Sequence, residues 1–206
     1  MAVIYLVRHG EVLWNREPPA YCGITDLELS PEGRRQAECL AARLAGAPLA
    51  ALYCSDLRRA RQTADAIAAP HALVPVADPA LREVNYGDWE GLSEAQVRCR
   101  WPDLYAAWRQ DAERVPIPGG ESFAALRDRV VPAMTAIAAR HPAESVAVVA
   151  HKSTNRVFLC ELLGLSPSHY RRIGQENAAV NILNYDEGRW RIDLVNDACH
   201  LVPGSR

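Results

Sequence analysis

The sequence contains no cysteine pair with CxxC spacing, no apolar run of membrane length and no basic tail. The six cysteines stand apart, so the sequence indicates neither a zinc site nor a redox dithiol. With a formal net charge of -2, nucleic-acid binding is not the default expectation, and nothing suggests a membrane span. The GxxxxGK[ST] signature of P-loop proteins and a spaced cluster of metal ligands are also missing.

These absences also bear on the cellular compartment. Six cysteines would permit a disulfide framework, but a chain of 206 residues that is 49% apolar has no need of one. We therefore expect reduced, buried thiols. The N-terminus shows no basic leader followed by an apolar segment, which is the pattern of a secretory signal. We expect a cytoplasmic protein.

Apolar runs alternate with helical patterns along the chain. Continuous apolar runs predict buried strands at 2–7, 49–54, 73–76 and 145–150. Ser30, Ser55 and Ser122 are predicted N-caps of helices that end near residues 46, 69 and 140. A further helix is predicted from 151 to about 164. The runs 178–186 and 189–196, separated by Glu187-Gly188, predict a terminal hairpin.

This alternation predicts an α/β fold, a three-layer α/β/α sandwich with a mostly parallel central sheet. We expect a single domain over residues 1–206, with a short helical excursion at about 85–120. That excursion holds Trp89, Trp101, Tyr105 and Trp108. Its aromatic side chains could form a lid, a wall of the substrate site or a dimer surface, so a homodimer is possible.

Two histidines mark one edge of this sheet. His9 follows the first predicted strand and His151 follows the strand at 145–150. Ligands of such sheets bind at the carboxyl ends of the strands, so we expect the two side chains in one site. Arg8 supports this, because a guanidinium near a buried strand end is costly unless an anion meets it. Gly10 lets backbone or ligand come close.

Positive charges accumulate where the helix after Ser55 begins, at Arg58, Arg59 and Arg61. Cations at a helix N-terminus oppose the helix dipole, so a bound anion would stabilise them. A solvated charged face is the alternative, and it fits Arg58 or Arg61.

The stretch 81–91 adds three carboxyl groups, Glu83, Asp88 and Glu90, beside Tyr86 and Trp89. A carboxyl group among aromatic side chains can serve as a general acid. An acidic surface loop would explain at least two of the three.

Four separated motifs appear in a characteristic order. They are Arg8-His9-Gly10-Glu11 with Asn15, Ser55-x-Leu57-x-Arg59-Ala60, Glu83 followed by Gly87-x-Trp89-Glu90-Gly91, and His151. Together they resemble the histidine phosphatase superfamily, in the branch that contains phosphoglycerate mutases and small-molecule phosphatases. The resemblance extends to 196–201 and implies a phosphoglycerate mutase-like fold. Gln175-Glu176-Asn177-Ala178 with Cys199-His200-Leu201 resembles the metal-independent phosphoserine phosphatases, and is also compatible with α-ribazole phosphatases and broad-specificity members.

The resemblance implies a role for each residue. His9 would be the nucleophile that forms a phosphohistidine, and Glu83 would be the general acid and base. Arg8, Arg59 and His151 would surround the phosphoryl oxygens. Asn15, Gly10, Gly23 and Lys152 would complete the substrate and phosphate site. The substrate would be a small phosphorylated metabolite, with no metal, no cofactor, no nucleic acid and no membrane involved.

One position departs from the family pattern. Many members have glycine after the second histidine, where this chain has Lys152. Its ammonium could point to solvent, or with Arg156 it could favour a substrate with a second acidic group.

Three activities are compatible with the resemblance. The excursion at 85–120 is shorter than in the mutases and does not hold the paired arginines expected there, so a phosphatase is favoured. A cofactor-dependent phosphoglycerate mutase is the alternative. An inactive, partner-binding member is a third possibility, which the presence of all five catalytic residues disfavours.

Overall fold

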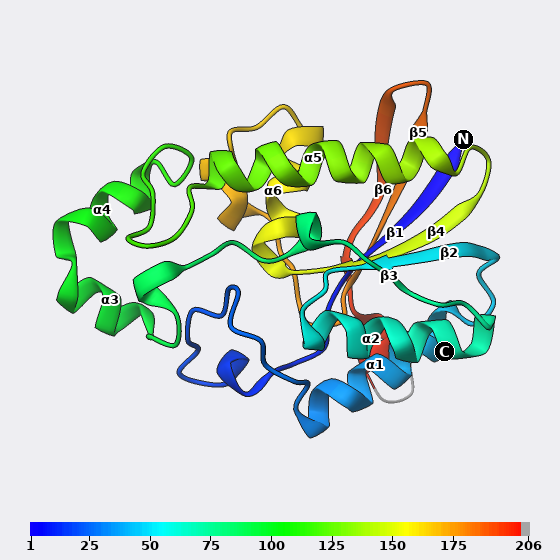
Figure 1. The fold of residues 1–206 in the computed structure, drawn as a ribbon, viewed down its shortest axis with the longest axis horizontal. Coiled ribbons are helices and arrows are strands. Elements are labelled where there is room, and N and C mark those ends of the chain that lie inside the picture. The colour runs from blue at the N-terminus through cyan, green and yellow to red at the C-terminus, as the bar shows by residue number, and fades with distance from the viewer. Residues whose placement is uncertain (203–206) are drawn as a thin grey trace.

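The computed structural model describes residues 1–202 and shows a six-stranded sheet between layers of helices (Figure 1). The strands are β1 (Ala2–Arg8), β2 (Leu49–Cys54), β3 (Val76–Ala77), β4 (Ser145–Ala150), β5 (Val180–Asp186) and β6 (Arg189–Asp197). The α-helices are α1 (Pro31–Leu44), α2 (Arg58–Ala68), α3 (Glu94–Arg100), α4 (Pro102–Gln110), α5 (Phe123–Arg140) and α6 (Lys152–Leu162). Residues 203–206 of the predicted domain lie outside this described part.

The sheet has the order β3-β2-β4-β1-β5-β6. The first four of these strands pair in parallel, and β5 and β6 form the predicted antiparallel hairpin. Helices α5 and α6 cover one face and α1 and α2 the other (Figure 1). The predicted three-layer sandwich with a mostly parallel sheet is thereby confirmed. Within residues 1–202, no helix is both long and apolar enough to cross a bilayer.

The pairing of β1 with β4 places the two histidines. Arg8 is the partner of Ala150 in the parallel register, and the His9 N–H donates to the Ala150 carbonyl at 3.1 Å. His9 and His151 therefore leave neighbouring strands at the same edge, as the sequence predicted.

Two predicted boundaries are wrong. Helix α2 begins at Arg58, and Ser55 does not cap it; the Asp26 carboxylate accepts the Arg58 N–H at 2.7 Å. This cap comes from a residue 32 positions away, so the local pattern could not indicate it. Strand β3 covers only Val76–Ala77 instead of 73–76, because pairing with β2, and not the apolar run, sets its length.

The excursion predicted at 85–120 forms α3 and α4, which extend past the edge of the sheet (Figure 1). Trp89 and Trp108 are fully buried there, with ring centroids 4.9 Å apart and edge to face. These two rings are the core of the segment, so they do not form an exposed surface for a dimer.

Trp108→Ala should lower the free energy of unfolding by about 3–5 kcal/mol, because the fully buried indole leaves a cavity that its neighbours cannot fill. Val74→Ala is the matched control, since Val74 is 84% exposed and its loss should change the value by less than about 0.5 kcal/mol. Urea unfolding monitored by circular dichroism would measure both, and similar midpoints for the two variants would contradict the core position of Trp108.

Candidate active site

A cavity of about 370 Å³ opens at the carboxyl edge of the sheet. Five of the predicted site residues line it: Arg8, His9, Asn15, Glu83 and Lys152. The other four, Gly10, Gly23, Arg59 and His151, contact these residues or their immediate supports and are not part of the wall. Most of the predicted residues therefore meet in one place, although they come from segments far apart in the chain.

The environment of His9 keeps its imidazole neutral. The ring is almost fully buried, and its Nδ1 lies 2.6 Å from the Gly10 carbonyl. A carbonyl only accepts hydrogen bonds, so Nδ1 carries the proton and Nε2 keeps its lone pair. Burial, followed by the nearby charges of Arg59 and Arg8, holds the pKa of His9 well below 6.5.

His151 has the opposite tautomer. Arg59 Nε donates to His151 Nδ1 at 3.2 Å, so the proton of the neutral ring lies on Nε2. That Nε2 is buried and has no hydrogen-bond partner within residues 1–202. Burial, Arg59 and His9 hold the pKa of His151 well below 6.5. The two rings are neighbours, with centroids 5.0 Å apart and planes tilted by 59°, so a ring with a free lone pair lies beside a ring with a free donor.

Arg59 is fully buried and is held by a loop. Its Nη1 donates to the Thr25 carbonyl at 2.8 Å and its Nη2 donates to the Gly23 carbonyl. The Glu90 carboxylate holds the same loop, accepting from Gly23 N–H at 3.1 Å and Ile24 N–H at 2.9 Å. Gly23 thus supports Arg59, and Glu90 supports Gly23.

Arg8 depends on a buried amide cluster around Gln175, a residue of the tail motif whose contact with Arg8 the sequence did not indicate. Its Nη1 donates to the Gln175 carbonyl at 2.7 Å, whereas its buried Nε has no partner within the described residues. The Gln175 side chain donates to Asn181 at 2.7 Å and accepts from Asn155 at 3.1 Å. Burial lowers the pKa of Arg8 to about 10, although Glu83 opposes the shift. Arg8 stays a cation at neutral pH.

Glu83 caps helix α6 from another part of the chain. Its carboxylate accepts from Ser153 N–H at 2.9 Å and Thr154 N–H at 3.2 Å, in the first turn of α6. His151, the N-cap residue, makes no side-chain capping hydrogen bond. The helix N-terminus favours a negative charge at this position, so capping fixes the carboxylate beside the cavity.

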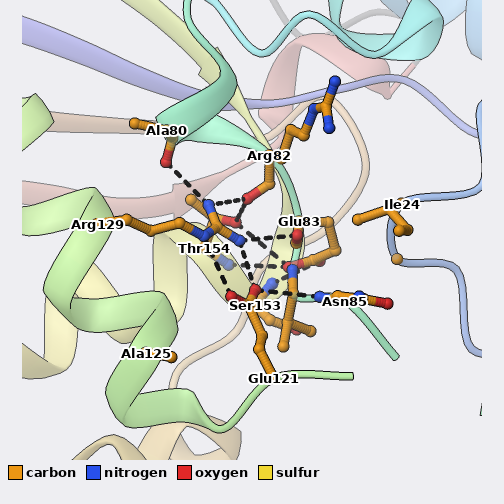
Figure 2. Close-up of polar contacts among 12 residues, drawn as sticks. Ile24, Ala80, Arg82, Glu83, Asn85, Glu121, Ala125, Arg129, Ser153 and Thr154 are labelled. Carbon is orange, nitrogen blue, oxygen red and sulfur yellow. Dashed lines mark hydrogen bonds and ion pairs between the residues drawn. The ribbon is translucent and has the colours of Figure 1, made fainter. Parts of the chain in front are cut away.

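Arg129 of α5 holds the backbone that carries Glu83 (Figure 2). Its guanidinium donates to the carbonyls of Ala80, Arg82 and Glu83 at 2.9, 2.7 and 2.9 Å. Glu121 accepts a further hydrogen bond at 2.6 Å and neutralises the charge. In the sequence Arg129 is one of many arginines, and no motif distinguishes it.

Asn15 and Gly10 have partners inside the protein. The Asn15 carbonyl oxygen accepts from Val12 N–H and from the Asn177 amide, both at 3.1 Å, so its own amide nitrogen remains for a ligand. The Gly10 N–H donates to Thr63 Oγ1 at 3.1 Å. A Cβ at Gly10 would overlap the backbone of Gly33, so Gly10 serves close packing of the backbone.

The remaining wall includes side chains that the sequence analysis did not place in the site. They are Tyr21, Tyr86, Ser153, Tyr170 and Arg171, with Arg156 as a residue considered only beside Lys152. Tyr86 and Ser153 share a hydrogen bond of 3.0 Å. Lys152 is exposed, yet desolvation at the cavity wall, followed by the charges of Arg8 and Arg156, lowers its pKa to about 8. Among the described residues, no group of three or more His, Cys, Asp or Glu side chains is arranged to hold a metal ion.

A family model, curated proteins and solved structures match this chain over nearly its whole length. The model of the histidine phosphatase superfamily (branch 1) matches residues 4–198. Phosphoserine phosphatase 1 of Hydrogenobacter thermophilus is 33% identical over 201 residues, which cover 98% of this chain and 95% of that protein. The probable phosphoglycerate mutase GpmB of Yersinia enterocolitica is 32% identical over 210 residues, covering 98% and 95%. The solved structure of a mycobacterial glucosyl-3-phosphoglycerate phosphatase with VO3 has a TM-score of 0.84 and 33% identity, covering 94% and 98%.

The lowered pKa values of His9 and His151 make stability depend on pH. In the unfolded chain these side chains bind protons near pH 6.5, as histidine ordinarily does, whereas in the folded protein they bind them only at much lower pH. The unfolded state therefore holds more protons below about pH 6.5, and the free energy of unfolding should fall as the pH is lowered through that value. Urea unfolding at a series of pH values would measure the slope. His151→Gln should reduce it, and an unchanged slope in His151→Gln would contradict the expectation.

Arg129→Met should lower the free energy of unfolding by about 3 kcal/mol, because three carbonyl groups and Glu121 lose their donor. Arg127→Met on the same helix is the control. Arg127 forms only partly exposed ion pairs with Glu113 and Asp128, so its loss should cost about 0–1 kcal/mol. Guanidinium unfolding would measure the free energy of unfolding of both variants. Equal losses would show that the Arg129 hydrogen bonds stabilise the fold no more than the partly exposed ion pairs of Arg127 do.

Proposed function

The chain belongs to branch 1 of the histidine phosphatase superfamily and is a phosphomonoester hydrolase. On this premise we propose that it acts on a small phosphorylated metabolite through a phosphohistidine at His9. The observation that carries this proposal is the pair of neutral histidines with opposite tautomers. His9 offers a lone pair at Nε2, and His151 offers a donor at Nε2, with ring centroids 5.0 Å apart.

In the first step His9 attacks the substrate. The Nε2 lone pair forms a bond to phosphorus while the bond from phosphorus to the ester oxygen breaks. Glu83 lines the same cavity, and its carboxylate takes the proton of a phosphoryl oxygen of the bound monoester monoanion and passes it to the leaving alkoxide. The lowered pKa of His9 supports this step, because a protonated imidazole has no lone pair to offer.

Buried donors would stabilise the negative charge that spreads over the phosphoryl oxygens. Arg8 Nε and His151 Nε2 are both buried without a partner within residues 1–202, so a phosphoryl group would satisfy two costly unpaired donors. The Asn15 amide would add a neutral donor. Arg59 would act mainly through His151, whose tautomer and orientation it fixes.

In the second step water removes the phosphoryl group. Glu83, again a carboxylate, accepts a proton from the water as its oxygen attacks phosphorus. The bond from phosphorus to Nε2 breaks, phosphate leaves and His9 returns to its neutral form. The capping hydrogen bonds from Ser153 and Thr154 keep Glu83 in place between the two steps.

The cations of the cavity would supply the charge neutralisation that a metal provides in many phosphoryl-transfer enzymes, so we propose a metal-independent reaction. We also propose a cytoplasmic location, because a reducing compartment preserves free thiols. The expectation of buried thiols holds only for Cys54 and Cys160, whereas Cys99 and Cys199 are exposed.

The similarity to a probable mutase makes phosphoryl transfer to a second substrate the competing possibility. A mutase would use the same phosphohistidine but would return the phosphoryl group to a hydroxyl of the substrate. Arg98 and Arg109, two of the arginines of the excursion, line a neighbouring hollow between α3 and α4, which shares Glu94 with the cavity of His9; neither arginine lines that cavity. This placement favours the phosphatase.

Phosphate release in EDTA should be catalysed by the native protein and abolished in His9→Ala. The panel is phosphoserine, phosphoglycerates, α-ribazole phosphate, sugar phosphates and nucleotides. Turnover by His9→Ala at the native rate would refute the phosphohistidine. If release is uniformly low, an assay primed with a bisphosphate would test the mutase.

Glu83→Gln should lower kcat by about 100- to 10,000-fold on alkyl phosphates, whose alkoxide needs a proton. Phosphoenzyme formation should be much less affected on p-nitrophenyl phosphate, whose leaving group needs none. Rapid-quench measurement of acid-labile phosphoenzyme on both esters would test this, with circular dichroism confirming that the variant is folded. Equal losses in phosphoenzyme formation on the two esters would exclude Glu83 as the general acid.

A further inference from the structure

Lys152 is the only lysine among the 206 residues, and it lies in the catalytic cavity. Arg156, one turn further along α6, and Arg171, at the end of the 3-10 segment Pro167–Arg172, line the same cavity. The phosphoryl site described above uses none of these three cations. Their presence beside it requires a separate explanation.

Within residues 1–202 no carboxylate forms an ion pair with any of the three. Other arginines of the chain do have such partners, for example Arg82 with Asp56 and Arg129 with Glu121. The Nε of Arg156 is buried and lacks a hydrogen-bond partner in the part of the chain that the structure describes. The charges of Lys152, Arg156 and Arg171 thus remain available to a ligand.

Holding these cations together is unfavourable for the free protein. Lys152 is the first residue of α6, where a positive charge opposes the helix dipole. Arg156 follows four positions later on the same helix, a spacing at which like charges repel. The guanidinium of Arg171 is fixed over the rings of Trp108 and Tyr170, at 4.5 and 4.7 Å from their centroids. An anion bound between the three would relieve the repulsion.

We propose that Lys152, Arg156 and Arg171 form a subsite for a carboxylate group of the phosphorylated substrate. This proposal rests on the proposed function, since the subsite adjoins the phosphoryl site at Arg8 and His9. The planar guanidinium of Arg156 matches a carboxylate, to which it can donate two parallel hydrogen bonds. Glu94 and Glu176 line the same cavity and repel a group of higher negative charge, so a monoanion is favoured over a second phosphate.

Two matched pairs of substrates isolate the carboxylate. 3-Phosphoglycerate and glycerol 3-phosphate differ by that group, as do O-phosphoserine and O-phosphoethanolamine. Lys152→Gln should raise KM for the carboxylated member of each pair by roughly 10- to 100-fold, with little change for the other member. Lys152→Arg should restore the discrimination, and Arg109→Gln, outside this cavity, should change neither member. An equal effect of Lys152→Gln on both members would overturn the proposal.

A second phosphate is distinguished by comparing fructose 1,6-bisphosphate with fructose 6-phosphate. Lys152→Gln should leave the ratio of their KM values unchanged. A loss of preference for the bisphosphate, with no change in the carboxylate pairs, would assign the three cations to a phosphate and overturn the carboxylate assignment.

The charge of Lys152 also gives the subsite a pH signature. Desolvation by the cavity wall and the charges of Arg8 and Arg156 lower its pKa to about 8, whereas Glu176 and Glu83 oppose the shift. Above that pH the ammonium loses its charge, so KM for 3-phosphoglycerate should rise relative to KM for glycerol 3-phosphate. The rise should be absent in Lys152→Arg; its persistence there would contradict the role of Lys152.

A labelling experiment tests binding without turnover. Because Lys152 is the only lysine, an amine-acylating reagent modifies only it and the N-terminus, and peptide mass spectrometry measures each. 3-Phosphoglycerate should protect Lys152 more than inorganic phosphate or glycerol 3-phosphate does. Protection without phosphate release would support the subsite and refute the phosphatase. Phosphate release with equal protection by all three ligands would refute the subsite alone.

Discussion

The parallel pairing of β1 with β4 is the constraint on which the site depends. Because Arg8 is opposite Ala150, the next residue on each strand is a histidine at the same edge of the sheet. A shift of this register by one residue would reverse the faces of β1 and separate the rings of His9 and His151. Both strands are largely buried between helices, so the apolar core fixes the register and, with it, the distance between the two imidazoles.

At this edge of the sheet, burial and the neighbouring positive charges both lower the pKa values of the two histidines. Both histidines lose solvent and lie near arginines, and each effect favours the neutral ring. Their single neighbouring partners, the Gly10 carbonyl and Arg59 Nε, then decide which nitrogen carries the proton. Two identical side chains thereby acquire different capacities, one as a lone-pair donor and one as a hydrogen-bond donor.

Hydrogen bonds from two different helices hold Glu83 and its carboxyl group in the site. Glu83 satisfies the N-terminal N–H groups of α6, the helix that follows His151, while Arg129 holds the backbone on which Glu83 sits. The segment with Glu83 and the helix with Lys152 therefore cannot move independently without loss of several hydrogen bonds. The same helix carries Lys152 in its first turn and Arg156 one turn further, so α6 contributes both to the position of the acid-base group and to the proposed carboxylate subsite.

The sequence alone determined the layers, the terminal hairpin and the convergence of His9 and His151, because burial of strands and their parallel order follow from local apolar patterns. It also indicated Arg8, Arg59 and Glu83 through their motifs. Only the tertiary structure decided the cap that Asp26 gives α2, the hold of Arg129 on residues 80–83 and the support of Arg8 by Gln175. These interactions join residues distant in the chain, and no local periodicity encodes them. The tertiary structure likewise buried Trp89 and Trp108, which the sequence could equally assign to a surface, because only packing between segments decides which face of an aromatic cluster is covered.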